Sequence, residues 1–326
     1  MAWVSLITTG GTIASQRVEE TGHVVVNVSG DRLRAAIHDA PVNVEIKVDD
    51  FLSIASFAMT LEMAFSLATR INFHLSHDDC LGVVVAHGTD TMEETAYLAD
   101  LVLAANKPVV FTGAQRSADD PASDGPRNVS DAIKLAASPL ALGLGVVVMF
   151  EQQFHAARDV TKSHTSRVDA FISRGHGKLG EIDGRVVSVS RHPVFRKTYS
   201  VDKIEPRVEL IKMVIGSDDR LIRFVAASGA KAIVLEGFGR GNTPPLVTAA
   251  VKDIVAAGVP VIVTSRCGDG RVRPIYGNGG GKDLEGAGAI FAGDLAGPKA
   301  RILLAVLMST GMTIDEIRHE VEEIGG

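Results

Sequence analysis

Short runs of Val, Ile, Leu and Ala, bounded by Gly or Pro, alternate along the chain with longer segments whose apolar residues recur at helical spacing. Continuous apolar runs suit strands that are covered on both faces, as in a parallel sheet. The runs predict strands at 3–8, 42–48, 81–87, 109–112, 145–150, 232–236 and 259–264. The intervening segments predict helices at 31–39, 61–75, 93–105, 129–137 and 246–257. This alternation predicts an α/β fold with a doubly wound, mainly parallel sheet.

Two local signals refine the organisation of the chain. The sequence Thr313-Ile-Asp-Glu316 is a capping box, which predicts the start of the last helix. The stretch 188–208 carries two prolines and seven charged residues and has no sustained helical or strand pattern. We therefore expect a linker at 191–208, between a large N-terminal domain at 1–190 and a smaller C-terminal α/β domain at 209–326.

Length and composition limit the classes of protein. A chain of 326 residues has room for two domains, and none of its apolar runs approaches the length of a membrane helix. Thr8 to Thr12 interrupt the first apolar run, so we expect no secretory leader and a cytoplasmic protein. The net charge of −6 argues against nucleic acid or an anionic membrane as a partner. Cys80 and Cys267 are expected to be free thiols.

The first expected strand runs directly into "TTGGTIAS", residues 8–15. In open α/β sheets, ligands bind beyond the carboxyl ends of the strands. Glycines allow a sharp turn and a close approach of the backbone to a ligand, so we expect the threonine side chains to point into the crevice. The alternative interpretation is an ordinary glycine-rich turn.

A second strand ends in a similar way, in "HGTDTMEETAY", residues 87–97. Thr89, Asp90 and Thr91 could be helix caps, but capping accounts for only one of the three. A third polar segment is "RDVTKSHTSRVDAF", which contains Lys162. Lys162 is either a solvated surface lysine or, beside a threonine hydroxyl, a member of a proton relay.

Other chemistries have weak support. "GFGRGN" at 237–242 and "GNGGGKD" at 277–283 are incomplete as nucleotide-binding signatures. The chain contains no His-Glu-x-x-His and no Gly-x-Ser-x-Gly, so neither a zinc peptidase nor a nucleophile-elbow hydrolase is indicated. We expect no metal site and no organic cofactor.

The motifs together resemble those of the bacterial-type L-asparaginases, amidohydrolases with a threonine nucleophile. The resemblance rests on "TTGGTIAS" and "VVVAHGTDTMEETAYLAD", and it extends in order over nearly the whole chain through "TGAQR", "SDGPRN", "ARDVTKSHTSRVDAF", "GKLGEIDG", "LEGFGRGN" and "GPKARILLAVL". It implies that the enzyme converts L-asparagine and water into L-aspartate and ammonia through a threonyl acyl-enzyme. It also implies a homotetramer, a dimer of dimers, in which each site lies between one chain's N-terminal domain and another chain's C-terminal domain.

The resemblance also assigns roles to residues of this sequence. Thr12 is the implied nucleophile, and Thr89 with Lys162 handles the proton and positions the hydrolytic water. Asp90 binds the α-ammonium group of the substrate, and Ser56 binds its α-carboxylate.

Further residues are implied to reach the site of a neighbouring subunit. Asn242 is one of them. The other is an acidic residue of "GGGKDLEG", for which Asp283 and Glu285 are both candidates.

The sequence departs from the family pattern in two further places. The family's loop tyrosine, which binds the nucleophile, has no counterpart between Gln16 and Asn27, where His23 is the nearest candidate. Ser56 is followed by Phe57 and Ala58 instead of polar residues, which leaves substrate recognition open.

Three alternatives to a strict asparaginase follow from these departures and from the family itself. One is a broader glutaminase-asparaginase or a related amidase with a different substrate preference. A second is a component of a tRNA-dependent amidotransferase, for which we expect an additional N-terminal module. A third is an inactive relative that binds an amino-acid amide without turnover.

Overall fold

The computed structural model describes residues 1–17, 23–26, 29–35, 37, 44–194 and 196–326. The chain divides into two compact units, Met1–Arg196 and Lys197–Gly326. This division falls inside the stretch 191–208, for which the sequence predicts a linker. Among the described residues of that stretch, no helix or strand occurs before Val208.

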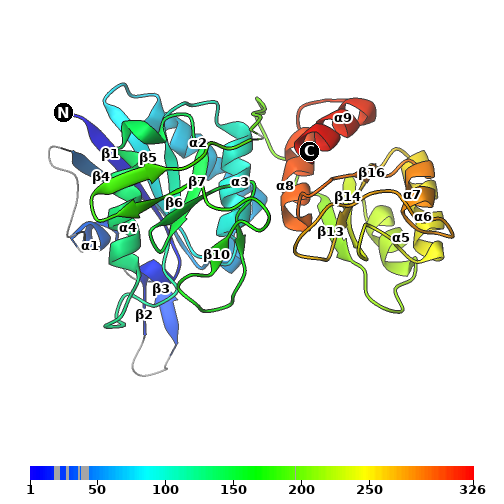
Figure 1. Ribbon diagram of the computed structural model, residues 1–326, viewed down its shortest axis with the longest axis horizontal. Helices are drawn as coiled ribbons and strands as arrows, with labels where there is room; N and C mark the ends of the chain where they lie inside the picture. The colour runs from blue at the N-terminus through cyan, green and yellow to red at the C-terminus, as the bar shows by residue number, and fades with distance from the viewer. Residues whose placement is uncertain (18–22, 27–28, 36, 38–43, 195) are drawn as a thin grey trace. The chain divides into compact units, whose positions relative to one another are not determined.

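The first unit is built on a mainly parallel sheet, which confirms the predicted fold class (Figure 1). Across the sheet the strands are β12 (Val186–Val189), β11 (Gly180–Asp183), β8 (Gln153–Ala156), β7 (Val146–Phe150), β6 (Val109–Thr112), β5 (Cys80–Ala86), β1 (Trp3–Gly10) and β4 (Glu45–Ile54). The strands from β7 to β4 run parallel, whereas β8, β11 and β12 add to the sheet in antiparallel fashion. Every residue of β1 is buried, as the continuous apolar run predicts.

Helices cover both faces of this sheet. They are α1 (Gly30–Ala35), α2 (Leu61–Leu75), α3 (Met92–Val102) and α4 (Gly125–Ala136). Helices α1 and α4 share one hydrophobic core, which contains Val4 and Leu6 of β1, while α2 and α3 pack on each other over the other face. Helices α2, α3 and α4 each connect two strands, and all three connections step in the same direction across the sheet. Because α4 lies on the opposite face from α2 and α3, its connection has the opposite hand to the other two.

Short elements surround the carboxyl ends of the strands. They are the 3₁₀ helices η1 (Thr12–Ala14) and η2 (Ser56–Ala58), the hairpin of β2 (Ser15–Arg17) with β3 (Val24–Val26), and the pair β9 (Thr161–Lys162) with β10 (Phe171–Ile172). A further 3₁₀ helix, η3 (Pro139–Ala141), precedes β7. The unit therefore concentrates its irregular segments at the edge where α/β proteins bind ligands.

The second unit has a smaller parallel sheet of its own. Its strands are, in order, β13 (Val208–Lys212), β14 (Ala232–Gly237), β15 (Val261–Ser265) and β16 (Ile290–Phe291). Its helices are α5 (Arg220–Ala227), α6 (Pro245–Ala256), α7 (Gly281–Gly286), α8 (Gly297–Leu307) and α9 (Ile314–Ile324). Helices α5, α6 and α7 contribute to one core, and α8 packs on β13, β14 and β15. The capping box predicted at Thr313 and Glu316 is confirmed.

Several boundaries differ from the sequence prediction. Helix α4 begins at Gly125, four residues before the predicted start, because its first turn carries Gly125 and Pro126 and lacks an apolar signal. Strand β4 continues to Ile54 through two aspartates that interrupt the apolar pattern. Residues 38–43, which include part of one predicted helix and one predicted strand, lie outside the described residues.

Candidate active site

A glycine turn follows the carboxyl end of β1. Gly10 and Gly11 have φ angles of 100° and 80°, in the left-handed region that favours glycine. Gly11 also lies against Gly88, since a Cβ added to Gly11 would stand 2.5 Å from the backbone nitrogen of Gly88. The turn that precedes Thr12 therefore touches the loop that follows β5.

Only one of the three threonines of this segment is available for chemistry. Thr8 Oγ1 donates a hydrogen bond to Asp50 Oδ1 at 2.6 Å, and Thr9 Oγ1 donates to the Ala86 carbonyl at 3.2 Å. Both side chains are buried, so the expectation that all the threonines point into a crevice is wrong for these two. Thr12 is partly exposed, and within the described part of the chain its hydroxyl has no hydrogen-bond partner.

Neighbouring segments hold η1, which starts at Thr12, in place. Ser15 Oγ donates to the Gly11 carbonyl at 2.7 Å, and the Ala118 N–H donates to the Ser15 carbonyl at 2.9 Å. A Cβ on Gly125, at the start of α4, would stand 2.9 Å from Ile13. The first turn of α4 therefore packs against η1, and Ile13 shares a hydrophobic core with α4.

The "TGAQR" and "SDGPRN" motifs form the loop between β6 and α4. The Asp124 carboxylate accepts hydrogen bonds from the backbone N–H groups of Gln115 and Arg116 at 3.0–3.1 Å. Asn128 Nδ2 donates to the Gly113 carbonyl at 3.0 Å and to Asp124 at 3.2 Å. The polar residues of these motifs thus stabilise the loop that supports η1.

Lys162 reaches the loop after β5. Its ammonium group donates hydrogen bonds to Thr89 Oγ1 at 2.8 Å and to Asp90 Oδ1 at 2.7 Å. Thr89 is 5% exposed, and the side chain of Lys162 is 16% exposed against 56% for Asp90. Lys162 is therefore not the solvated surface lysine of the alternative interpretation, and it joins a hydroxyl to a carboxylate.

Ser56 lies on the other side of the same loop. It starts η2, it is buried, and its Oγ accepts a hydrogen bond from the backbone N–H of Asp90 at 3.2 Å. A Cβ on Gly88 would stand 2.6 Å from this oxygen. The contacts of Gly88 with Gly11 and with Ser56 bring the Thr12 turn, η2 and the Thr89 loop together in the first unit.

His87 precedes these residues and carries no charge at neutral pH. Its burial lowers its pKa to about 4, against the opposing effect of its hydrogen bond to the Gly88 carbonyl. Because a carbonyl only accepts, the ring Nδ1, 2.7 Å away, carries the hydrogen. The hydrogen bond of His87 therefore fixes the peptide between Gly88 and Thr89. Because His87 is neutral, the cation beside Thr89 is Lys162.

The segment without the family tyrosine is a β-hairpin. Strands β2 and β3 pair so that Ser15 faces Val26 and Arg17 faces Val24. Residues 18–22 and 27–28 lie outside the described residues, and His23 is exposed. The hairpin follows η1 directly in the chain.

Asn242, Asp283 and Glu285 belong to the second unit and thus to a different body from Thr12. Asn242 Oδ1 accepts a hydrogen bond from the Gly281 N–H at 3.0 Å, so Asn242 is tied to the start of α7. Asp283 Oδ2 accepts from the Gly279 N–H at 2.6 Å. Glu285 is exposed and forms an ion pair with Lys282 at the surface. The two acidic candidates thus differ, because the carboxylate of Asp283 holds a backbone turn and that of Glu285 does not.

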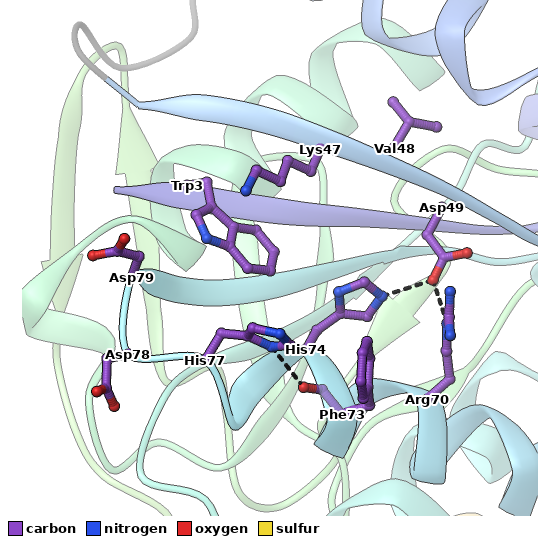
Figure 2. Close-up of a pocket in the computed structure, with 10 residues that line it drawn as sticks. All are labelled: Trp3, Lys47, Val48, Asp49, Arg70, Phe73, His74, His77, Asp78 and Asp79. Atoms are coloured by element: carbon purple, nitrogen blue, oxygen red, sulfur yellow. Dashed lines mark hydrogen bonds and ion pairs between the residues drawn. The ribbon is translucent and has the colours of Figure 1, made fainter. Parts of the chain in front are cut away.

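A separate pocket of about 760 Å³ lies at the opposite, amino-terminal edge of the first sheet, between β4 and α2 (Figure 2). Asp49 Oδ2 accepts hydrogen bonds at 2.6 Å from both Arg70 and His74. Burial alone would raise the pKa of Asp49, but these hydrogen bonds and charges outweigh it and lower the pKa. Trp3, the only tryptophan of the chain, packs edge-on against His74. None of the site residues expected from the sequence lines this pocket.

The described residues lack two features that would suggest other functions. No group of three or more His, Cys, Asp and Glu side chains there could hold a metal ion. No described helix is both long enough and apolar enough to cross a bilayer.

Comparisons with known proteins cover both units. The family model described as "Asparaginase, N-terminal" matches residues 3–195, and the "Glutaminase/Asparaginase C-terminal domain" model matches residues 207–320. An L-asparaginase of Bacillus licheniformis is 36% identical over 308 residues, which are 94% of this chain and 95% of that protein. One component of the glutamyl-tRNA(Gln) amidotransferase of Pyrococcus abyssi is 34% identical over 328 residues, which cover 97% of this chain and 74% of that component. The crystal structure of a probable cytoplasmic L-asparaginase from Campylobacter jejuni superimposes with a TM-score of 0.90 at 28% identity, over 99% of this chain and 100% of that chain.

Proposed function

The chain belongs to the bacterial-type L-asparaginase family, and from that premise we propose that it hydrolyses L-asparagine to L-aspartate and ammonia through an acyl ester on Thr12. The observation that carries the proposal is the cluster of Lys162, Thr89 and Asp90. This cluster adjoins the Thr12 turn through the contact of Gly88 with Gly11. The Thr12 hydroxyl, which makes no hydrogen bond within the described part of the chain, thus follows a turn that touches a loop able to move protons and bind charge.

The proposed reaction has two displacements. Thr12 Oγ1 attacks the side-chain amide carbon, the hydroxyl proton is transferred to the leaving amide nitrogen, and the C–N bond breaks to release ammonia. Water then attacks the acyl ester, and aspartate leaves as the Thr12 hydroxyl is restored. Backbone N–H groups of the glycine-flanked turns can stabilise the oxyanion in both steps, and such a donor contributes about 3 kcal/mol.

Lys162 and Thr89 form the proposed proton route of the site, and they position the hydrolytic water. The Thr89 oxygen accepts a hydrogen bond from Lys162, so its own hydrogen can be donated to another group. Asp90 is the proposed partner of the substrate ammonium group, and its exposed carboxylate suits that role. Ser56 is the proposed partner of the substrate carboxylate. The arrangement requires neither a metal nor an organic cofactor.

We propose that a neighbouring copy of the chain completes each site, with Asn242 and Glu285 as the contributed residues of a homotetramer built from two dimers. The support is the family pattern, together with the finding that Asp283 is committed to a backbone turn and Glu285 is not. Light scattering would give the mass of the assembly, and a fully active monomer would contradict the proposal. The cytoplasm is the proposed location, as the name of the Campylobacter jejuni relative states for that protein.

Substrate preference distinguishes the alternatives. One additional methylene changes discrimination by about 1–3 kcal/mol, so glutamine could be a second substrate. The amidotransferase relative makes ammonia transfer to a partner a second candidate function. Amidase activity against L-Asn, D-Asn, L-Gln and succinamate separates the amidases, while recovery of the chain with tRNA and a second protein would favour the amidotransferase.

Replacement of Thr12 tests the chemistry. We expect Thr12→Ala to abolish ammonia release from L-asparagine and Thr12→Ser to retain part of it. Thr69→Ala is the control, since Thr69 lies exposed on α2 and its hydroxyl donates to the Phe65 carbonyl of the same helix. Full activity of Thr12→Ala would disprove the proposed nucleophile.

A further inference from the structure

We propose that the first turn of α3 positions the two halves of the site separately, with Thr91 fixing the Ser56 turn and Glu93 fixing Lys162. This inference rests on the proposed function, because it assigns substrate binding to Ser56 and proton transfer to Lys162. Thr91 and Glu93 are positioning residues that act through Ser56 and Lys162. The geometry therefore predicts that their replacement affects different kinetic constants.

Thr91 occupies the N-cap position of α3 but does not cap it. The spacing from Thr91 to Glu94 is that of a capping box, in which the threonine oxygen would accept a backbone N–H. Within the described chain, the Thr91 side chain makes no such bond, and its Oγ1 instead donates to the Ser56 carbonyl at 2.8 Å. The Thr91 hydroxyl thus bonds a residue 35 positions away in the sequence instead of capping its own helix.

The bond from Thr91 completes a two-point attachment of the Ser56 turn. The backbone N–H of Asp90 holds the Ser56 side chain, and Thr91 holds the Ser56 carbonyl. Both attachments come from consecutive residues at the start of α3. Loss of the Thr91 hydroxyl leaves the Ser56 turn tied to the start of α3 through the Asp90 N–H, so the turn can shift and move the Ser56 side chain away from a bound carboxylate.

Glu93 forms a corresponding contact with the strand that carries the lysine. Its Oε2 accepts a hydrogen bond from the backbone N–H of Lys162 at 2.8 Å, across 69 residues of sequence. Strand β9 consists only of Thr161 and Lys162, and it pairs with β10. The contact between Glu93 and Lys162 sets the point from which the lysine side chain extends to Thr89.

The test compares kcat and KM for L-asparagine hydrolysis. We expect Glu93→Ala to lower kcat by about 10- to 100-fold, because small displacements of a reacting group are costly. We expect Thr91→Val, which keeps the shape and removes the donor, to raise KM about fivefold with little change in kcat. Glu93→Gln and Thr91→Ser keep an acceptor and a donor, respectively, so each should restore most of the affected constant.

Helix α2 supplies matched controls. Its N-cap is Thr60, whose oxygen does accept the Met63 N–H at 3.2 Å, and Glu62 stands two residues further on, as Glu93 does from Thr91. Thr60→Val and Glu62→Ala remove the same groups from an equivalent helix start, and both should leave kcat and KM unchanged. Melting temperatures of all variants show whether a variant is folded.

Two outcomes overturn the inference. The first is that kcat and KM change together in both Glu93→Ala and Thr91→Val. The second is that kcat and KM both stay unchanged in either of these variants. If Glu93→Ala does not fold, Glu93→Asp replaces it, since it keeps the charge but withdraws the carboxylate from Lys162, and an unchanged kcat then overturns the inference. Full activity of Thr12→Ala contradicts the proposed function instead, so the two failures are distinguishable.

Discussion

Gly11 and Gly88 are in direct backbone contact, although 77 positions separate them along the chain. The contact joins the turn after β1 to the turn after β5, and neither position has room for a side chain. A hydroxyl on one turn can therefore lie close to a hydroxyl and a carboxylate on the other. The proposed chemistry depends on this distance staying short.

We expect Gly11→Ala to eliminate asparagine hydrolysis. The added methyl group meets the backbone of Gly88, which cannot move aside as a flexible side chain could. Gly258→Ala is the control, since its φ of 84° resembles the 80° of Gly11 but a Cβ there meets nothing within 4 Å. Both variants carry a positive φ that side chains rarely adopt, which costs about 1–3 kcal/mol. Equal activities in an ammonia assay would contradict the proposed role of the contact.

We expect Lys162→Met to lower kcat by about 100-fold or more, the usual contribution of a positioned proton-transfer group. The substitution preserves much of the apolar stem and removes both hydrogen bonds to Thr89 and Asp90. Lys178→Met removes a lysine that pairs with Glu181 at the surface and should leave kcat unchanged. Steady-state kinetics measure both, and a Lys162→Met enzyme with normal kcat would exclude the proton route.

We expect the free energy of unfolding to decrease as the pH falls from 6.5 to 4. Burial lowers the pKa of His155 to about 4, with Arg191 and Lys178 adding to the effect. The unfolded chain binds a proton near pH 6.5 and the native chain only near pH 4, so the free energy of unfolding decreases as the pH falls through this window, by about 3 kcal/mol for this one group.

His155→Gln tests this linkage. It cannot titrate, and it can still bond Ser173, which lies 2.9 Å from the ring. Urea unfolding at pH 7 and pH 4.5 should show a smaller loss of stability for the variant than for the native chain. His319→Gln, at an exposed position, should retain the native pH dependence, and an equal pH dependence of His155→Gln would refute the assignment.

We expect Asp49→Asn to lower the free energy of unfolding at pH 7 by about 1–3 kcal/mol, because Arg70 and His74 lose a shared, largely buried carboxylate. The pKa of Asp49 is lowered in the native state, so its contribution is complete above the unfolded value of 3.8 and disappears as the pH falls through the native value.

Circular dichroism during urea unfolding measures the effect. Asp78→Asn is the control, since Asp78 lines the same pocket and the structure describes no ion pair for it. Hydrolysis should be unaffected in both variants, because the pocket is at the opposite edge of the sheet from Thr12. A stability of Asp49→Asn equal to the native value would refute the role of the carboxylate.

Local patterns predicted the regular elements well. Helix α2 spans 61–75 as its periodicity indicates, because Thr60 caps it and its buried positions recur at helical spacing. The parallel strands β1, β5, β6, β7, β14 and β15 followed from their apolar runs, whereas the parallel strands β13 and β16 were not predicted. Strands β8, β11 and β12 were not predicted, because runs of four residues with mixed polarity resemble loops.

The candidate site was only partly accessible from the sequence. Thr12, Thr89 and Lys162 were predicted from strand ends and from the family resemblance, and those assignments stay predictions until they are tested. The contact of Glu93 with Lys162 had no sequence signal, because an acidic residue in a first helical turn already has a local explanation in the helix dipole. The prediction that Thr8 points into the crevice was wrong, because the sequence pattern does not show that the Thr8 hydroxyl donates a hydrogen bond to Asp50.

The single indole of the chain stands at one end of β1, a strand of 8 residues, and the Thr12 turn follows the other end. A strand of that length spans about 25 Å. Emission from Trp3 therefore reports on the corner beside His74, and a small molecule bound at the Thr12 turn cannot quench it by contact. A change in that emission upon addition of asparagine would therefore not come from contact at the Thr12 turn.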